Sequence, residues 1–260
     1  SDPIDYKVSH TKVSNLKNAV AYDEKVIIVS EQTQFVAQGD TPKTFSVDPS
    51  TEFECSPLCA PVGAGRNVYF AFTNGEGDAS GFDGIREYSV DRSTDNKDAI
   101  DITAQVPKYI PNGTFKLISS TTVNILIALT EGDAPAMYLY KYFYANQDKL
   151  QSAWMRIDFA GDDAVVLGGE FIASTLYLVI QHSDGVYLER MNFSPGRTDP
   201  GVNFVTHLDR RVTDEDCVSV TYDSLLNRTT WTLPYVPDST VQVVSREENP
   251  GIIQTLINAD

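Results

Sequence analysis

The chain has 260 residues and carries 36 acidic against 20 basic side chains, which gives a formal net charge of −16 and an isoelectric point near 4.5. A hydrophobic content of 42% with 22% charged residues is that of a globular protein, so disorder and collagen-like or low-complexity scaffolds are excluded for the chain as a whole. The acidic balance also argues against a surface that holds nucleic acid by neutralising phosphates, because such a surface needs excess Lys and Arg.

Strand signals dominate the chain. Short stretches rich in β-branched and aromatic residues alternate with clusters of Gly, Asp, Asn and Pro, while helical spacing is not sustained over a dozen residues anywhere before residue 250. One very apolar strand recurs, and it predicts an equivalent strand in each of four units, at residues 25–30, 67–73, 124–130 and 175–181.

Each recurring apolar strand is followed by a polar turn and a second strand with aromatic residues, predicted at residues 34–36, 85–90, 137–144 and 186–193. A further strand follows in each unit, predicted at residues 44–47, 99–106, 153–159 and 202–208. A weaker strand precedes the apolar one at residues 16–20, 115–119 and 164–167, and the corresponding stretch 61–64 is less clear.

Four antiparallel strands repeated at intervals of about 40 to 55 residues are typical of a β-propeller. We therefore predict an all-β fold in which residues 16 to about 204 form at least four four-stranded blades. A β-sandwich would also contain many short strands, but it does not require the regular return of one very apolar strand. That strand is expected to be buried on both faces, between neighbouring blades.

The pattern changes after residue 205. Residues 217–222 and 229–233 flank a turn with Asp and Asn, which predicts a β-hairpin that Pro234 and Pro237 then end. The predicted domains are a propeller-like domain at 1–204 and the start of a small β module at 205–260. Because the chain begins with Ser1 and the pattern is under way within twenty residues, we expect an interior piece of a longer protein.

Motifs that would carry catalysis are missing from the sequence. It contains no G-x-S-x-G, H-E-x-x-H or P-loop pattern, and His182-Ser183-Asp184 is interpreted as a surface turn because sequence adjacency does not build a catalytic triad. The loop at residues 74–84 has oxygen ligands and glycines enough for Ca²⁺ but lacks the EF-hand spacing. We predict no catalytic, cofactor-binding or metal-binding residue and no cofactor.

The three cysteines are an odd number in a chain too large to need disulfide stapling, so free thiols in a reducing compartment are expected. A bridge between Cys55 and Cys59, or a metal site, is the alternative. No apolar run approaches the roughly 18 residues that a membrane-spanning helix needs, and the first fifteen residues lack the apolar core of a signal peptide.

A tyrosine ladder is the densest aromatic pattern in the chain. Its members alternate along one predicted strand and therefore point to one face: Tyr138, Tyr140, Tyr142 and Tyr144. Such a ladder is a possible interaction surface, where it would stack sugar rings or meet a protein partner. Packing between blades is the other interpretation.

Several blocks resemble the tail tubular protein B, or nozzle protein, family of T7-like short-tailed bacteriophages. The resemblance spans nearly the whole chain without a catalytic motif, and its blocks are DPID at 2–5, SHTKV at 9–13, QTQFV at 32–36, DITAQVPKYIPNG at 101–113, YKYFY at 140–144, QSAW at 151–154 and LPY at 233–235.

The resemblance implies a non-enzymatic component of the virion, located in the phage tail and assembled in the host bacterial cytoplasm. It implies a propeller-like domain within a longer polypeptide, several copies in a ring, an adaptor or gatekeeper protein as neighbour, and tail fibres docked around it. The duplex genome would pass through the centre without specific binding. The competing function is a carbohydrate-binding or carbohydrate-active propeller that contacts host polysaccharide.

The net charge of −16 has two interpretations in a conduit for DNA. An acidic wall would repel the polyanion over about 8 Å at ~0.15 M salt and so limit binding during passage. Solubility alone is the other interpretation, and the sequence favours neither.

Overall fold

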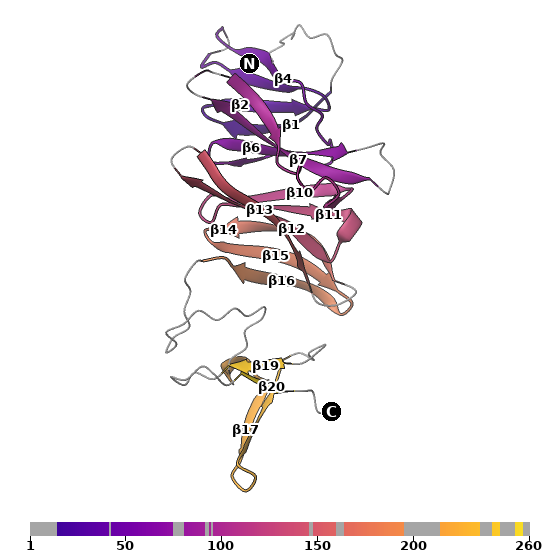
Figure 1. The fold of residues 1–260 in the computed structure, drawn as a ribbon, viewed down its shortest axis with the longest axis vertical. Coiled ribbons are helices and arrows are strands. Elements are labelled where there is room, and N and C mark those ends of the chain that lie inside the picture. Colours follow the sequence, from indigo (N-terminus) through magenta and orange to yellow (C-terminus); the bar gives the residue numbers. More distant parts are fainter. Residues whose placement is uncertain are drawn as a thin grey trace. The chain divides into compact units, whose positions relative to one another are not determined.

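The computed structural model describes residues 15–41, 43–74, 81–91, 94, 96–145, 148–159, 164–194, 214–234, 241–244 and 253–256 (Figure 1). Contacts between residues divide the chain into two compact units, Ser1–Phe193 and Ser194–Asp260. The described part is built from antiparallel strands joined by turns and two short 3-10 segments. The all-β prediction is therefore confirmed.

The first two sheets of the first unit are meanders in which each strand pairs with the next. The first sheet contains β1 (Leu16–Tyr22), β2 (Lys25–Ser30), β3 (Gln34–Gln38) and β4 (Ser46–Thr51). The second sheet contains β5 (Val62–Ala64), β6 (Asn67–Asn74), β7 (Phe82–Asp91) and β8 (Asn96–Asp101), and the short β9 (Ile110–Pro111) also pairs with β7.

The third and fourth sheets repeat the same order. The third contains β10 (Thr114–Ser120), β11 (Ile125–Thr130), β12 (Ala136–Ala145) and β13 (Asp148–Asp158), with the 3-10 turn η1 (Glu131–Asp133) between its two middle strands. The fourth contains β14 (Val165–Ile172), β15 (Thr175–His182) and β16 (Gly185–Asn192) in the described residues. Residues 202–208, predicted as its last strand, lie outside the described part.

The four recurring apolar segments occupy the same structural position. Each is the second strand of its sheet, and they correspond to β2, β6, β11 and β15. This confirms the repeat and the antiparallel blade-like units. In the first unit the sheets follow one another as a stack (Figure 1), but they do not close into a ring in the described residues, so the propeller itself is not confirmed.

The core lies between successive sheets, because alternate side chains of one strand enter different layers. On β11, Leu126 packs toward the second sheet and Ile127 toward the fourth, and all six residues of the strand are buried. The expectation of a strand covered on both faces is thus confirmed for β11. On β15, Leu178 is buried while Val179 on the opposite face is 36% exposed, because another sheet packs on only one face of this strand within the described residues.

The second unit contains two hairpins in its described residues. The 3-10 turn η2 (Asp214–Asp216) precedes β17 (Ser219–Asp223), which pairs with β18 (Arg228–Thr232), as the sequence predicted within two residues. Strand β19 (Val241–Val244) pairs with β20 (Ile253–Leu256). The predicted domain boundary at 204–205 lies outside the described residues and stays a prediction.

Candidate functional site

The tyrosine ladder lies on β12, where strand pleating sends its side chains toward the second sheet. Tyr138, Tyr140 and Tyr142 are 2%, 2% and 5% exposed, and Tyr144 at the strand end is half-buried. The rings of Tyr140 and Tyr142 are 5.8 Å apart, and Trp154 of β13 lies 5.0 Å from Tyr140. Three of the four rings therefore fill the space between two sheets, where neither a sugar nor a protein partner reaches them.

A buried ion pair closes one end of the ladder. Glu87 of β7 is 5% exposed, and one carboxylate oxygen lies 2.5 Å from Lys149 Nζ on β13. The same oxygen accepts a hydrogen bond from the Tyr69 hydroxyl at 2.7 Å, and the other accepts one from Tyr144 at 3.2 Å. Lys149 also reaches the Tyr140 hydroxyl at 3.2 Å. The carboxylate of Glu87 on the second sheet and the ammonium group of Lys149 on the third sheet thus compensate each other's charge.

The pKa shifts in this cluster have clear causes. Burial raises the pKa of the Tyr69 hydroxyl, and the neighbouring charge of Glu87 adds to that effect. Burial alone would lower the pKa of Lys149, but the hydrogen bond and charge of Glu87 outweigh it and raise the pKa. The network therefore holds a neutral phenol and a charged amine around the Glu87 carboxylate, an arrangement that joins the second and third sheets.

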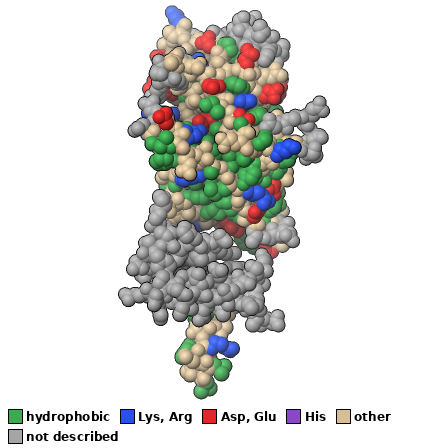
Figure 2. Space-filling model, in the orientation of Figure 1, with side chains coloured by type: hydrophobic (Ala, Val, Ile, Leu, Met, Phe, Trp, Pro, Cys, Tyr) green, Lys and Arg blue, Asp and Glu red, His purple; other side chains and the backbone are tan. Residues whose placement is uncertain are grey.

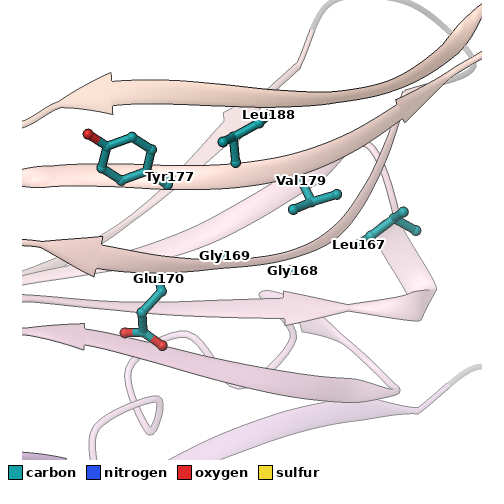
Figure 3. A pocket seen from close by; sticks show the side chains of 7 residues that line it. All are labelled: Leu167, Gly168, Gly169, Glu170, Tyr177, Val179 and Leu188. Atoms are coloured by element: carbon teal, nitrogen blue, oxygen red, sulfur yellow. The ribbon is translucent and has the colours of Figure 1, made fainter.

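The outer face of the fourth sheet leaves several large apolar side chains exposed. They are Leu167, Ile172, Val179, Val186 and Leu188, with exposed fractions of 46%, 66%, 36%, 59% and 71%. A shallow hollow of about 460 Å³ lies on this face (Figure 3), lined by Leu167, Gly168, Gly169, Glu170, Tyr177, Val179 and Leu188.

The hollow has a structural origin in a β-bulge. The pairing of β14 with β15 shifts between Val166 and Gly168, and a Cβ on Gly168 would meet nothing within 4 Å. Its one acidic side chain, Glu170, lies 3.8 Å from Lys116. A surface with one solvated carboxylate does not provide the pair of carboxylates that a glycosidase needs.

The turn His182-Ser183-Asp184 joins β15 to β16, as the surface-turn interpretation predicted. The Asp184 carboxylate accepts a hydrogen bond from the Tyr187 hydroxyl at 3.0 Å, and His182 Nε2 lies 3.4 Å from Glu189. The acid and the imidazole thus have different partners, so the turn does not form a Ser-His-Asp triad.

Cys55 and Cys59 are free thiols buried in the first unit. Burial raises the pKa of each to about 12, so the thiolate that metal binding or nucleophilic attack requires is disfavoured. Among the described residues, no three His, Cys, Asp or Glu side chains lie close enough to hold a metal ion. Residues 75–80 of the loop considered for calcium lie outside the described part. No helix in the described part is long and apolar enough to span a membrane.

On the face drawn in Figure 2, acidic and basic side chains of the first unit are interspersed with hydrophobic ones. Sequence reasoning found the ladder but missed the ion pair of Glu87 with Lys149 and the one-sided burial of the fourth sheet. Neither has a local signal, because each depends on which sheet lies opposite.

A comparison with models of protein families identifies the family of this chain. The family model described as bacteriophage nozzle protein matches residues 1–255. This chain belongs to the bacteriophage nozzle protein family. The nozzle assignment agrees with the resemblance found in the sequence blocks.

Among nozzle-related proteins, the chain is 37% identical over 202 residues to the tail tubular protein gp12 of Escherichia phage T7. The match covers 76% of this chain and 25% of the T7 protein. The nozzle-family chain therefore spans about a quarter of the length of its curated relative.

The search of solved structures gives matches with low TM-scores. The Hsv2 protein of Kluyveromyces lactis matches with a TM-score of 0.46 and 8% identity, covering 86% of this chain and 74% of that one. A protein of Bacteroides uniformis described as a putative 6-phosphogluconolactonase matches with a TM-score of 0.34 and 12% identity, covering 95% and 85%. Scores this low carry no argument about the function of the nozzle-family chain.

Proposed function

We propose that this chain is a structural, non-enzymatic part of a phage tail, where it forms wall material of a multi-subunit nozzle. The observation that carries the proposal is the nozzle-family match over residues 1–255. The buried aromatic ladder and the single carboxylate of the apolar hollow favour packing over sugar chemistry, and this argues against the carbohydrate alternative.

The four sheets are proposed to be consecutive blades of a β-propeller that further sheets complete. Three neighbouring pairs of sheets bury apolar clusters between them, and the outer face of the fourth sheet offers side chains of the same kind. The relative from phage T7 is about four times longer than the matched segment, which leaves ample chain for additional blades.

The proposed neighbours are further copies of the chain in a ring, an adaptor or gatekeeper protein, and tail fibres. Duplex DNA would pass through without specific binding, since the net charge of −16 opposes neutralisation of phosphates. The site of the finished protein would be the virion tail, after assembly in the host cytoplasm.

Labelling with gold-conjugated antibodies against residues 1–193 tests the location in the particle. We expect label at the distal tail in electron micrographs. Label over the capsid, or on particles lacking tails, would contradict the structural assignment.

The propeller is tested separately by thiol labelling of Leu188→Cys, with Cys217→Ser to remove a half-exposed thiol. Leu188 is 71% exposed, so we expect rapid reaction in the 260-residue chain and slow reaction in the assembled particle. Equal rates would show that no further sheet covers this face. Leu58→Cys, at 74% exposure, is the matched control for reactivity in the 260-residue chain.

A further inference from the structure

The hairpin of β17 and β18 has two chemically different faces. The cross-strand pairs place Val220 opposite Trp231 and Tyr222 opposite Thr229 on one face. Trp231 and Tyr222 are 47% and 64% exposed there. The other face carries hydroxyl side chains: Ser219, Thr221, Thr230 and Thr232. The hairpin is therefore amphipathic across its thickness.

The tip of the hairpin is the most exposed apolar point among the described residues. Leu225 and Leu226 are 94% and 63% exposed, and Figure 2 shows hydrophobic side chains at the hairpin end. Their backbone N–H groups donate to one oxygen of Asp223, at 2.9 and 3.1 Å. Asn227 adopts a left-handed φ of 49° and accepts a hydrogen bond from the Tyr222 hydroxyl at 2.9 Å.

These hydrogen bonds preorganise the tip of the hairpin. They also lower the free-energy cost of transferring its backbone N–H groups out of water. An unsatisfied backbone donor is expensive in an apolar medium, whereas the two leucine amides already have an acceptor within the hairpin. The low charge of this segment also favours its transfer out of water. Residues 217–234 contain one acidic and one basic side chain, Asp223 and Arg228, in a chain whose net charge is −16.

We propose that this hairpin tip inserts shallowly into the interfacial layer of a lipid bilayer. A strand rises about 3.3 Å per residue, so Trp231 lies about 10 Å behind the Asp223–Arg228 pair and Tyr222 about 3 Å behind it. With the leucines at the edge of the hydrocarbon, both aromatic rings occupy the headgroup region that Trp and Tyr favour, and the hydroxyl face stays in water.

A lipid surface fits these features better than a protein pocket does. The tip of the hairpin is a narrow turn with two adjacent apolar side chains, Leu225 and Leu226. A fluid lipid layer accommodates such a turn, whereas a protein would need a cavity of matching shape. The absence of a basic cluster in residues 217–234 indicates a zwitterionic surface rather than an anionic one. The inference does not depend on the proposed function in the tail.

The test is flotation of the 260-residue chain with phosphatidylcholine vesicles, repeated for Leu225→Ser/Leu226→Ser. We expect the wild-type chain to float with the vesicles and the double variant to lose at least tenfold in partition coefficient. Leu58→Ser is the matched control, since Leu58 is 74% exposed in another turn and its N–H also donates to a side-chain oxygen, Ser56 Oγ at 3.3 Å. This variant should partition like the wild type.

Quenching by brominated lipid adds a readout of depth. Trp231 should be quenched, while Trp154, whose Nε1 donates to the Ile102 carbonyl between two sheets, should not. The proposal is overturned if the wild-type chain does not partition at millimolar lipid, or if the double variant partitions equally. It is also overturned if sedimentation shows a wild-type dimer that the double variant abolishes without any vesicle binding, because the apolar face would then join two copies.

Discussion

Replacing Lys149 by Met should destabilise the first unit by removing the cation that compensates a buried carboxylate. Glu87 retains 7% side-chain exposure and Lys149 retains 22%. Loss of one partner from a fully desolvated pair costs about 3–5 kcal/mol, and the residual exposure of Lys149 places the expected loss at about 2–3 kcal/mol. For a unit of this size the loss lowers Tm by about 4–12 °C.

A double-mutant cycle separates the ion pair from general packing. Lys149→Met, Glu87→Gln and the double variant are compared by chemical denaturation followed by circular dichroism. We expect the double variant to be less destabilised than the sum of the two single variants, because it leaves no buried charge unpaired. The control is Lys116→Met, whose partner Glu170 lies 3.8 Å away with 67% of its side chain exposed, and which should cost under about 1 kcal/mol.

Two results would refute this reasoning. One is a loss for Lys149→Met no larger than that for Lys116→Met, which would mean that Glu87 is solvated in solution. The other is strict additivity in the cycle, which would mean that the two side chains act independently despite their 2.5 Å separation.

Leu126→Ala should cost about 2–5 kcal/mol in denaturation experiments, since the side chain is fully buried, whereas Leu188→Ala at 71% exposure should change stability by under about 0.5 kcal/mol. The hydrogen bond from Arg156 lowers the pKa of Asp133, so its contribution to stability is complete above the ordinary value of 3.8 and is lost as the pH falls through the lowered pKa. Asp133→Asn should therefore remove part of the acid dependence seen in denaturation below pH 3.8, and unchanged dependence would contradict this. Incubation with host polysaccharide should release no reducing sugar, and release that one carboxylate substitution abolished would reveal an enzyme.

How far the sequence predicts the fold can be judged from single strands. The apolar run of β11 predicted a strand covered on both faces, and the alternation of Leu126 and Ile127 between two clusters confirms it. The same kind of run in β15 was expected to be covered on both faces too, but Val179 is open because coverage depends on a neighbouring sheet. The composition of a strand shows that it favours burial, but it does not show whether a second sheet is present to bury it.

The candidate sites show the same limit. The pleat of β12 predicted that the ladder tyrosines share a face, and three of them enter one cluster. Their contact with Glu87 and Lys149 was not predictable, because these two residues are 62 positions apart and meet only when two sheets stack. Leu225 lies in the predicted turn between β17 and β18, but its 94% exposure depends on the packing around the hairpin and has no local sequence signal.

The sequential packing of the sheets gives the first unit a gradient of local stability. In a linear array each layer is stabilised by the layers beside it, so a layer with two neighbours opens less often than one with a single neighbour. Amide hydrogens of β11, enclosed between two apolar clusters, should exchange with solvent far more slowly than those of β15. The first and fourth sheets, which each have a single neighbouring sheet, would then detach under force or protease before the two sheets between them. A chain extended by another sheet beyond the fourth would shift that weak point outward.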